Sequence, residues 1–273
     1  LLRESELRVT PQLPDRWSKS GRDGRGPRGE YTARMADRFY TPQPLAAGEF
    51  VLDGPEAHHL AAVRRFGPGD RVTLFNGDGR EYPAAVVSVG KRSVALTVHA
   101  AVEADRELGF ELVVASALPK GDRADFLIEK LTELGVTRFV PLVAARSVVV
   151  PRGNVVEKFR RAVIEASKQC GRNVLMTVDP LAKWGEFVRS AGLPAARLVL
   201  HTEGGPPAVE GVRGGVAVAV GPEGGLTADE VAEAVAAGWR PATLGPRVLR
   251  VETAAVAAAA LMGKSQIPST KSQ

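Results

Sequence analysis

Residues 216 to 230 read VAVAVGPEGGLTADE and contain the strongest structural signal in the chain. Val216 to Val220 is a continuous apolar run, which is typical of a central strand covered on both faces. The glycine-rich turn Gly221 to Gly225 follows, and Thr227 then precedes Glu230 by three residues, which is the spacing of a helix capping box worth about 1 kcal/mol. A strand, a glycine turn and a capped helix in this order predict an α/β domain with a parallel sheet.

The alternation of strands and helices extends over residues 106 to 264, which we predict to be one domain. The capped helix is expected to end at Gly238. The last helix, over residues 253 to 262, is nearly all Ala, Val and Leu, so both of its sides must pack, within the chain or against another subunit. Further strands are predicted at 111–116, 138–143, 197–201 and 242–244, and apolar helix faces at Leu127, Leu131 and Leu134 and at Phe159, Val163, Ala166 and Cys170.

The residues before this domain show a different sequence pattern. Residues 35 to 105 contain short β-like runs separated by turn signals, which predicts a small β-barrel or sandwich. The pairs Asn-Gly and Asp-Gly at 76 to 79 favour a hairpin because these residues tolerate positive φ, and one short helix is expected over 56 to 65. Residues 1 to 34 are rich in Arg, Gly, Pro and Ser and are predicted to be a disordered basic leader, and residues 265 to 273 a C-terminal tail.

Composition excludes several protein classes. The 273 residues are 44% hydrophobic and 25% charged, and no apolar run approaches the roughly 20 residues of a membrane span, so we expect a cytoplasmic globular protein. The single cysteine, Cys170, excludes an internal disulfide, and four scattered histidines suggest no metal site. The net charge of +5 is not evidence for RNA binding by itself, because residues 1 to 34 with Lys264 and Lys271 supply it.

Three glycine-bearing loops follow the last three predicted strands, at 201–205, 221–225 and 244–253. Ligands bind at the carboxyl ends of strands in open α/β sheets, where loops and helix N-termini present free backbone N–H groups. One ligand could therefore touch all three loops. Other motifs are weaker. Gly263-Lys264-Ser265 lacks the rest of a phosphate-binding loop, and no Gly-x-Gly-x-x-Gly follows the first strand. His58-His59 in a short helix favours a structural or RNA-facing role over catalysis.

Several segments between Arg38 and Met262 resemble the RsmE family of 16S rRNA (uracil-N3)-methyltransferases, which belongs to the SPOUT class. The most specific are GPEGG at 221 to 225 and the run from Leu244 to Ala254. Cys170 stands where the family more usually has serine. The other segments are Arg38-Phe39-Tyr40, His58-His59-Leu60 with Val63-Arg64-Arg65, Leu118 to Arg123, Glu129 to Val136, Glu165-Ala166 and Gln169 to Arg172.

The resemblance implies a C-terminal SPOUT domain with a trefoil knot, an N-terminal PUA-like RNA-binding barrel, and a homodimer that needs no metal and no membrane. It also implies that the cofactor is S-adenosylmethionine, held with its adenine among backbone groups of the three loops. The cofactor-binding candidates are Leu200, His201, Thr202, Glu203, Gly204, Gly221, Pro222, Glu223, Gly224, Gly225, Leu244, Gly245, Val248, Leu249 and Thr253.

The implied reaction methylates N3 of a uridine in 16S rRNA of the small ribosomal subunit. Arg250 or Arg172 would face the uracil oxygens, and Glu252 would orient the loop or accept the N3 proton. The candidates for RNA contacts are Arg38, Arg64, Arg65, Lys120, Arg123 and Arg172. Two alternatives remain: a SPOUT methyltransferase acting on another RNA, and a non-catalytic RNA-binding assembly factor.

Overall fold

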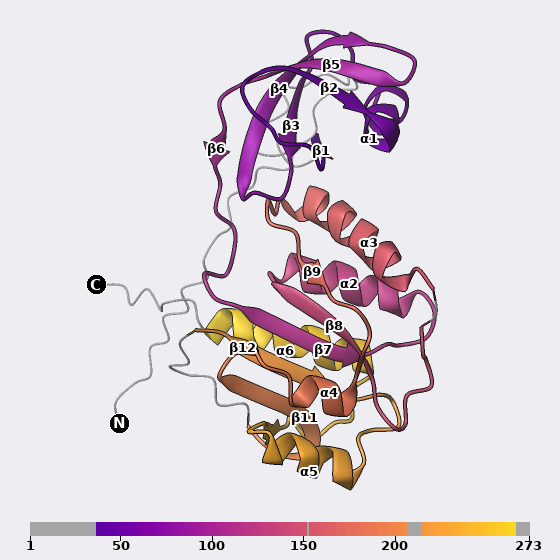
Figure 1. Cartoon of the computed structure of the whole chain (residues 1–273), viewed down its shortest axis with the longest axis vertical. Helices are drawn as coiled ribbons and strands as arrows, with labels where there is room; N and C mark the ends of the chain where they lie inside the picture. Colours follow the sequence, from indigo (N-terminus) through magenta and orange to yellow (C-terminus); the bar gives the residue numbers. More distant parts are fainter. Residues whose placement is uncertain (1–36, 152, 207–213, 266–273) are drawn as a thin grey trace, which may run out of the picture.

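A computed structural model describes residues 37–151, 153–206 and 214–265, and it contains two sheets joined by the segment after Glu103 (Figure 1). The first sheet belongs to a small N-terminal domain and the second to a larger α/β domain. The predicted leader lies outside the described residues, as does the predicted tail apart from Ser265.

The N-terminal domain is a six-stranded sheet around its own core. Its strand order is β1-β3-β4-β5-β2, with β6 paired to β4; β1 runs parallel to β3 and the other pairs are antiparallel. A register shift between Val86 and Ser88 bends β4, which helps the sheet to curve around buried Phe39, Leu74 and Leu96. The strands are β1 Arg38–Tyr40, β2 Gly48–Asp53, β3 Arg71–Phe75, β4 Arg80–Val89, β5 Ser93–Val98 and β6 Val102–Glu103.

Two local predictions for this domain are confirmed. The turn between β3 and β4 contains Gly77 and Gly79, both at positive φ, and the strands on either side pair as a hairpin. The predicted short helix begins two residues early, at Gly54, because Pro55 suits the first helical turn. It continues as α1 Gly54–His58 and then as a π-helical turn, η1 His59–Val63.

The second sheet has seven strands, all parallel, in the order β10-β8-β7-β12-β11-β13 with β9 on β8. The central strands β7 and β12 are buried along their whole length, as the apolar run from Val216 to Val220 predicted for β12. The strands are β7 Leu112–Ala117, β8 Arg138–Val143, β9 Thr177–Val178, β10 Ala182–Lys183, β11 Ala196–Gly205, β12 Val216–Val220 and β13 Arg240–Ala242.

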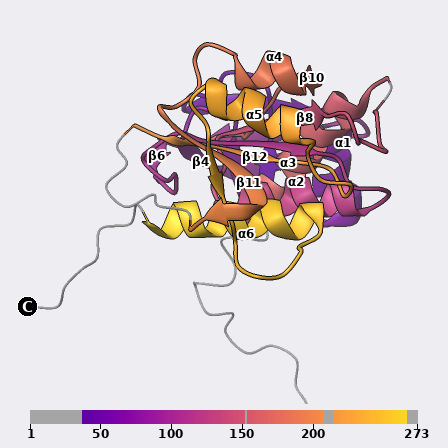
Figure 2. The same ribbon diagram turned by 90° about the horizontal axis from the view of Figure 1, so that it is seen from below.

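Helices cover both faces of this sheet (Figure 2). On one face pack α2 Arg123–Glu133, α3 Val155–Cys170 and α6 Val251–Ser265, and on the other α4 Trp184–Val188 and α5 Ala228–Ala236. The capping box at the start of α5 is confirmed, since Thr227 Oγ1 accepts from the Glu230 backbone N–H at 3.2 Å and Glu230 Oε2 accepts from the Thr227 N–H at 2.8 Å.

Three expectations for the end of the chain differ in detail from the structure. β13 lies two residues earlier than predicted, and α6 begins two residues earlier, at Val251. One side of α6 is buried, at Ala255, Ala258 and Met262, but Leu261 on its other side is 47% exposed, so the described residues cover only one face of this helix. The trefoil knot stays a prediction.

A polar corner joins the two domains, and it contains two predicted RNA-binding residues. The guanidinium of Arg38 donates to Glu81 Oε1 at 2.5 Å, to Asn173 Oδ1 at 2.5 Å and to the Arg172 carbonyl at 3.1 Å. Burial lowers the pKa of Arg38, although the Glu81 carboxylate offsets part of this effect. Burial also favours the neutral form of Glu81, but hydrogen bonds from Arg106 and Arg38 outweigh it and lower the pKa of Glu81.

Arg172 occupies the same corner with its side chain turned inward. Its guanidinium donates to the carbonyls of Thr132 and Val136, both at 2.9 Å, and to the two carboxylate oxygens of Glu107 at 3.1 and 2.6 Å. Arg38 is 4% exposed and Arg172 is 3% exposed. The prediction that these two arginines contact RNA is therefore wrong, as is a uracil-facing role for Arg172, because their charged groups are already used to join the domains.

Candidate active site

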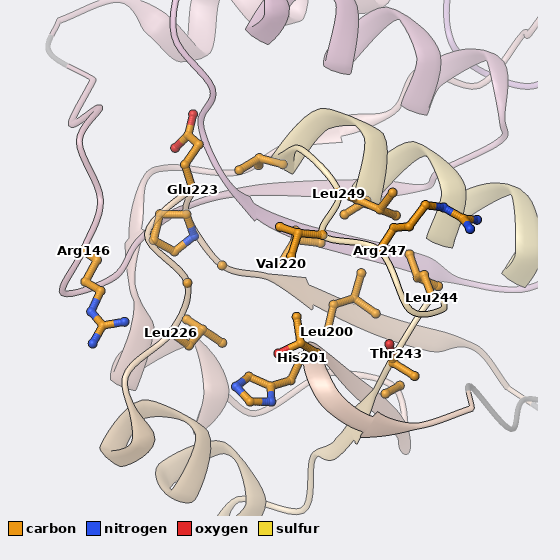
Figure 3. Close-up of a pocket in the computed structure, with 18 residues that line it drawn as sticks. Arg146, Leu200, His201, Val220, Glu223, Leu226, Thr243, Leu244, Arg247 and Leu249 are labelled. Atoms are coloured by element: carbon orange, nitrogen blue, oxygen red, sulfur yellow. The ribbon is translucent and has the colours of Figure 1, made fainter.

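The three predicted glycine-bearing segments converge on one cavity of about 320 Å³ at the carboxyl ends of β11, β12 and β13 (Figure 3). Residues 201–205, predicted as a loop, form the bulged end of β11 instead. This is the position at which open α/β sheets bind ligands. The cavity is lined by Arg146, Leu200, His201, Thr202, Val220, Gly221, Pro222, Glu223, Gly225, Leu226, Ala242, Thr243, Leu244, Arg247, Val248, Leu249, Val251 and Ala254.

Most of the predicted cofactor residues line this cavity, but five do not: Glu203, Gly204, Gly224, Gly245 and Thr253. Two of these glycines serve packing instead. A Cβ at Gly204 would lie 2.5 Å from the backbone nitrogen of Ala242, and one at Gly224 would lie 3.1 Å from Cβ of Arg146. Glycine is needed at 204 because the backbone of β13 comes too close for a side chain, whereas a side chain at 224 would require a small shift of Arg146.

The residues that sequence reasoning missed include a fourth loop, from Ala144 to Ser147. Its backbone is fixed by two side chains: Ser147 Oγ accepts from the Ala144 N–H at 2.9 Å, and Glu230 Oε1 accepts from the Ala145 N–H at 2.7 Å. Arg146 then reaches the second glycine loop, where Nη1 donates to the Gly224 carbonyl at 3.0 Å. This loop follows β8, so the strand-end rule that identified the other three could have identified it too.

The cavity walls suit a flat aromatic group with polar edges. Apolar side chains of Leu200, Val220, Leu226, Leu244 and Leu249 form much of the lining. The backbone N–H groups of Leu244, Val248 and Leu249 have no hydrogen-bond partner among the described residues. Apolar walls with a few free amides are typical of small-molecule sites. A nucleoside base has both the flat faces and the edge acceptors that such a site requires.

Four titratable side chains line the cavity: Arg146, His201, Glu223 and Arg247. Arg146, Glu223 and Arg247 make no ion pair with any residue in the described part of the chain. His201 Nδ1 accepts from the Glu203 N–H at 3.3 Å. The charges at this site are therefore free to bind a ligand.

The three predicted catalytic residues do not lie together. Arg250 is exposed just before α6, and its carbonyl accepts from the Ala254 N–H at 2.8 Å. Glu252 is buried in the first turn of α6, with Oε1 3.5 Å from Nη1 of Arg123, while Oε2 has no hydrogen-bond partner in the described region. Neither lines the cavity, although both adjoin the loop that does, and Arg172 is in the interdomain corner.

The other predicted RNA contacts have different surroundings. Arg64 pairs with Asp37 at 2.7 Å, Arg65 is exposed with φ at +59°, and Lys120 is exposed after β7. Arg123 is partly buried and pairs with Glu252. No group of three or more potential metal ligands occurs among the described residues, and none of their helices is long and apolar enough to cross a membrane.

Comparison with known proteins agrees with this architecture. An RNA methyltransferase domain profile matches residues 106–263, and the profile of an RNA methyltransferase PUA domain matches residues 52–98. The ribosomal RNA small subunit methyltransferase E of Mycobacterium bovis is 34% identical over 243 residues, covering 84% of this chain and 92% of the relative. The enzyme of the same name from Bacillus subtilis is 32% identical over 222 residues, covering 76% and 87%.

Two solved structures share the fold. One is the ribosomal RNA small subunit methyltransferase E from Neisseria gonorrhoeae bound to S-adenosyl methionine, with a TM-score of 0.78 and 30% identity over 84% of this chain and 97% of that one. The other is a Legionella pneumophila methyltransferase with bound cofactor SAM, with a TM-score of 0.77 and 31% identity over 84% and 98%. With a domain profile over more than half of its length and relatives above 30% identity over most of both chains, this protein belongs to the RsmE family of ribosomal RNA small subunit methyltransferases.

Proposed function

We propose that this protein methylates N3 of a uridine in 16S rRNA of the small ribosomal subunit, with S-adenosylmethionine as methyl donor. The observation that carries the proposal is the cavity lined by the bulged end of β11 and the loops after β12 and β13. Relatives of the same family are named ribosomal RNA small subunit methyltransferase E, and two structural neighbours were solved with S-adenosylmethionine bound. The proposed site of action is the cytoplasm, where ribosomal subunits are assembled.

The residues of the cavity fit an adenosyl group. Leu200, Leu244 and Leu249 offer apolar contacts for the faces of adenine, and the free amides of Leu244 and Val248 can donate to its edge nitrogens. When bound, S-adenosylmethionine supplies an activated methyl group on a sulfonium. The protein's part is to position the acceptor base beside that methyl group, and positioning can supply much of the rate.

The acceptor nitrogen of uridine carries a weakly acidic proton, which must be removed before or during methyl transfer. The negative charge then spreads over O2 and O4, and a positioned cation stabilises it. We assign this role to Arg250, which is exposed beside the cavity. Glu252 is buried and paired with Arg123, so we assign it to holding the loop before α6 rather than to removing the proton.

The RNA must present its target as an unpaired or flipped base, because N3 is engaged when uridine pairs in a duplex. Arg64, Arg65 and Lys120 are the predicted RNA contacts that remain available at the surface, and we propose that they bind phosphates. An rRNA segment in a small subunit meets the requirement for an exposed base better than a free duplex does.

Loss of this protein should remove one N3-methyluridine from 16S rRNA, and the wild-type chain should restore it. Arg250→Ala should restore it with a turnover number lower by about tenfold to a hundredfold and with cofactor affinity unchanged, because one charge-stabilising contact is lost. Nucleoside mass spectrometry of purified 16S rRNA and single-turnover kinetics measure these quantities. A missing methyl group in another RNA would favour the alternative substrate, and no change in any RNA would favour a non-catalytic assembly factor.

We also propose that the protein works as a homodimer that uses the outer face of α6. This face carries Thr253, Ala257, Ala260 and the half-exposed Leu261 next to the cofactor loop. An apolar helix face of this kind favours a protein contact. Light scattering should give twice the monomer mass, and Leu261→Glu should give the monomer, because a buried unpaired carboxylate is costly. A wild-type monomer at micromolar concentration would contradict the proposal.

A further inference from the structure

One end of the cavity carries two side chains of opposite charge that do not neutralise each other. Glu223 belongs to the glycine loop after β12 and Arg146 to the loop after β8. Both are exposed, and no ion pair joins them to each other or to another described residue. Figure 3 shows both on the same side of the cavity, with Arg247 on the opposite side. Unpaired charges on cavity-lining side chains suggest a charged ligand group.

The two loops that carry these side chains are held together by the protein itself. Arg146 Nη1 donates to the carbonyl of Gly224, the residue directly after Glu223, at 3.0 Å. A Cβ at Gly224 would come within 3.1 Å of Arg146 Cβ, so the two loops pack closely at this point. A guanidinium has five N–H donors, so this one bond leaves others that can bind a ligand.

The position of Arg146 depends on Glu230. One carboxylate oxygen of Glu230 caps α5 through the Thr227 N–H, and the other accepts from the Ala145 N–H at 2.7 Å. The same carboxylate thus fixes both the helix after the glycine loop and the loop that carries Arg146. Glu230 is therefore a positioning residue, which fixes the relative placement of the two loops that carry Arg146 and Glu223.

We propose that Arg146 and Glu223 recognise the zwitterionic amino-acid end of the cofactor, with the guanidinium of Arg146 binding the α-carboxylate and the carboxylate of Glu223 binding the α-ammonium group. The inference rests on the proposed function, since it assumes that S-adenosylmethionine occupies the cavity. A group with one negative and one positive charge matches one arginine and one glutamate at the same end. Arg247 remains available for RNA at the other end of the cavity.

Calorimetry with two neutral-sulfur ligands tests the assignment. S-adenosylhomocysteine keeps the amino-acid end, whereas 5′-methylthioadenosine keeps the adenosyl group and lacks that end. In Arg146→Met the affinity for S-adenosylhomocysteine should fall by about tenfold, because a charge-assisted contact is lost, and that for 5′-methylthioadenosine should stay within about twofold. Glu223→Gln should likewise lower the affinity for S-adenosylhomocysteine and leave that for 5′-methylthioadenosine nearly unchanged. Arg247→Met is the matched control, another arginine of the cavity replaced by the same residue, and it should keep the wild-type ratio of the two affinities.

Each other outcome has a defined meaning. If Arg146→Met weakens both ligands equally, Arg146 only supports the glycine loop, and the proposal is overturned. If Arg247→Met rather than Arg146→Met narrows the ratio, the carboxylate lies at the opposite end of the cavity, which also overturns it. If the wild-type protein binds neither ligand, the proposed cofactor is wrong, whereas binding of both with an unchanged ratio in all variants refutes only the charge pairing.

Discussion

Arg172→Met will lower the free energy of unfolding by about 3–5 kcal/mol, which is the usual cost of breaking a buried ion pair from one side. The side chain is 3% exposed and donates to Glu107 and to the carbonyls of Thr132 and Val136. Methionine keeps much of the volume but leaves both carbonyls and a partly buried carboxylate without their donor. Urea denaturation followed by far-UV circular dichroism measures the change.

Arg106→Met is the matched control for this corner. Arg106 also reaches across it, to Glu81 Oε1 at 2.7 Å and to the Gly171 carbonyl at 2.8 Å, but its side chain is 45% exposed, so its removal should cost less than about 1 kcal/mol. Binding of a 16S rRNA fragment well below the melting temperature should be the same for Arg172→Met and wild type. If Arg172→Met had wild-type stability but bound the RNA fragment more weakly, Arg172 would contact RNA after all.

Five of the seven strands of the second sheet could be predicted because their signals are local, whereas the two-residue strands β9 and β10 gave no such signal. The apolar run from Val216 to Val220 and the spacing of Thr227 and Glu230 each depend on a few neighbouring residues, and both appear in the structure as expected. The three strand-end loops followed from the same pattern and line one cavity. The pairs Asn-Gly and Asp-Gly likewise predicted the hairpin after β3, where Gly77 and Gly79 take positive φ.

The partners of long side chains could not be predicted in the same way. Arg38 and Arg172 have the sequence appearance of phosphate contacts, yet Arg38 reaches Asn173 in the other domain, 135 positions away. Arg146 gave no signal on its own, because its place in the cavity depends on Glu230, 84 positions later, accepting from Ala145. Such contacts are determined by tertiary packing, which a pattern of neighbouring residues does not contain.

Gly204→Ala will disrupt the cofactor cavity, although Gly204 does not line it. Leu200 and Gly205 of β11 both pair with Ala242 of β13, so residues 201–204 loop out and return to the same point. A Cβ at Gly204 would lie 2.5–2.6 Å from backbone atoms of Ala242, which cannot move aside as a side chain can. The strands must separate, at a cost of about 3 kcal/mol or more at the upper end of overpacking effects.

The residues that line the cavity on either side of this contact explain why Gly204→Ala should lower ligand affinity as well as stability. His201 and Thr202 lie on the looped part of β11, and Thr243 and Leu244 follow β13 directly. Separating the strands moves these walls apart, so affinity for S-adenosylhomocysteine should fall by about a hundredfold in calorimetry. Gly205→Ala is the matched control, since a Cβ there would meet nothing within 4 Å, and it should bind normally. If both variants bind alike, the close approach of β11 and β13 is not what shapes the cavity, and the free amides of the loop after β13 must be positioned by another contact.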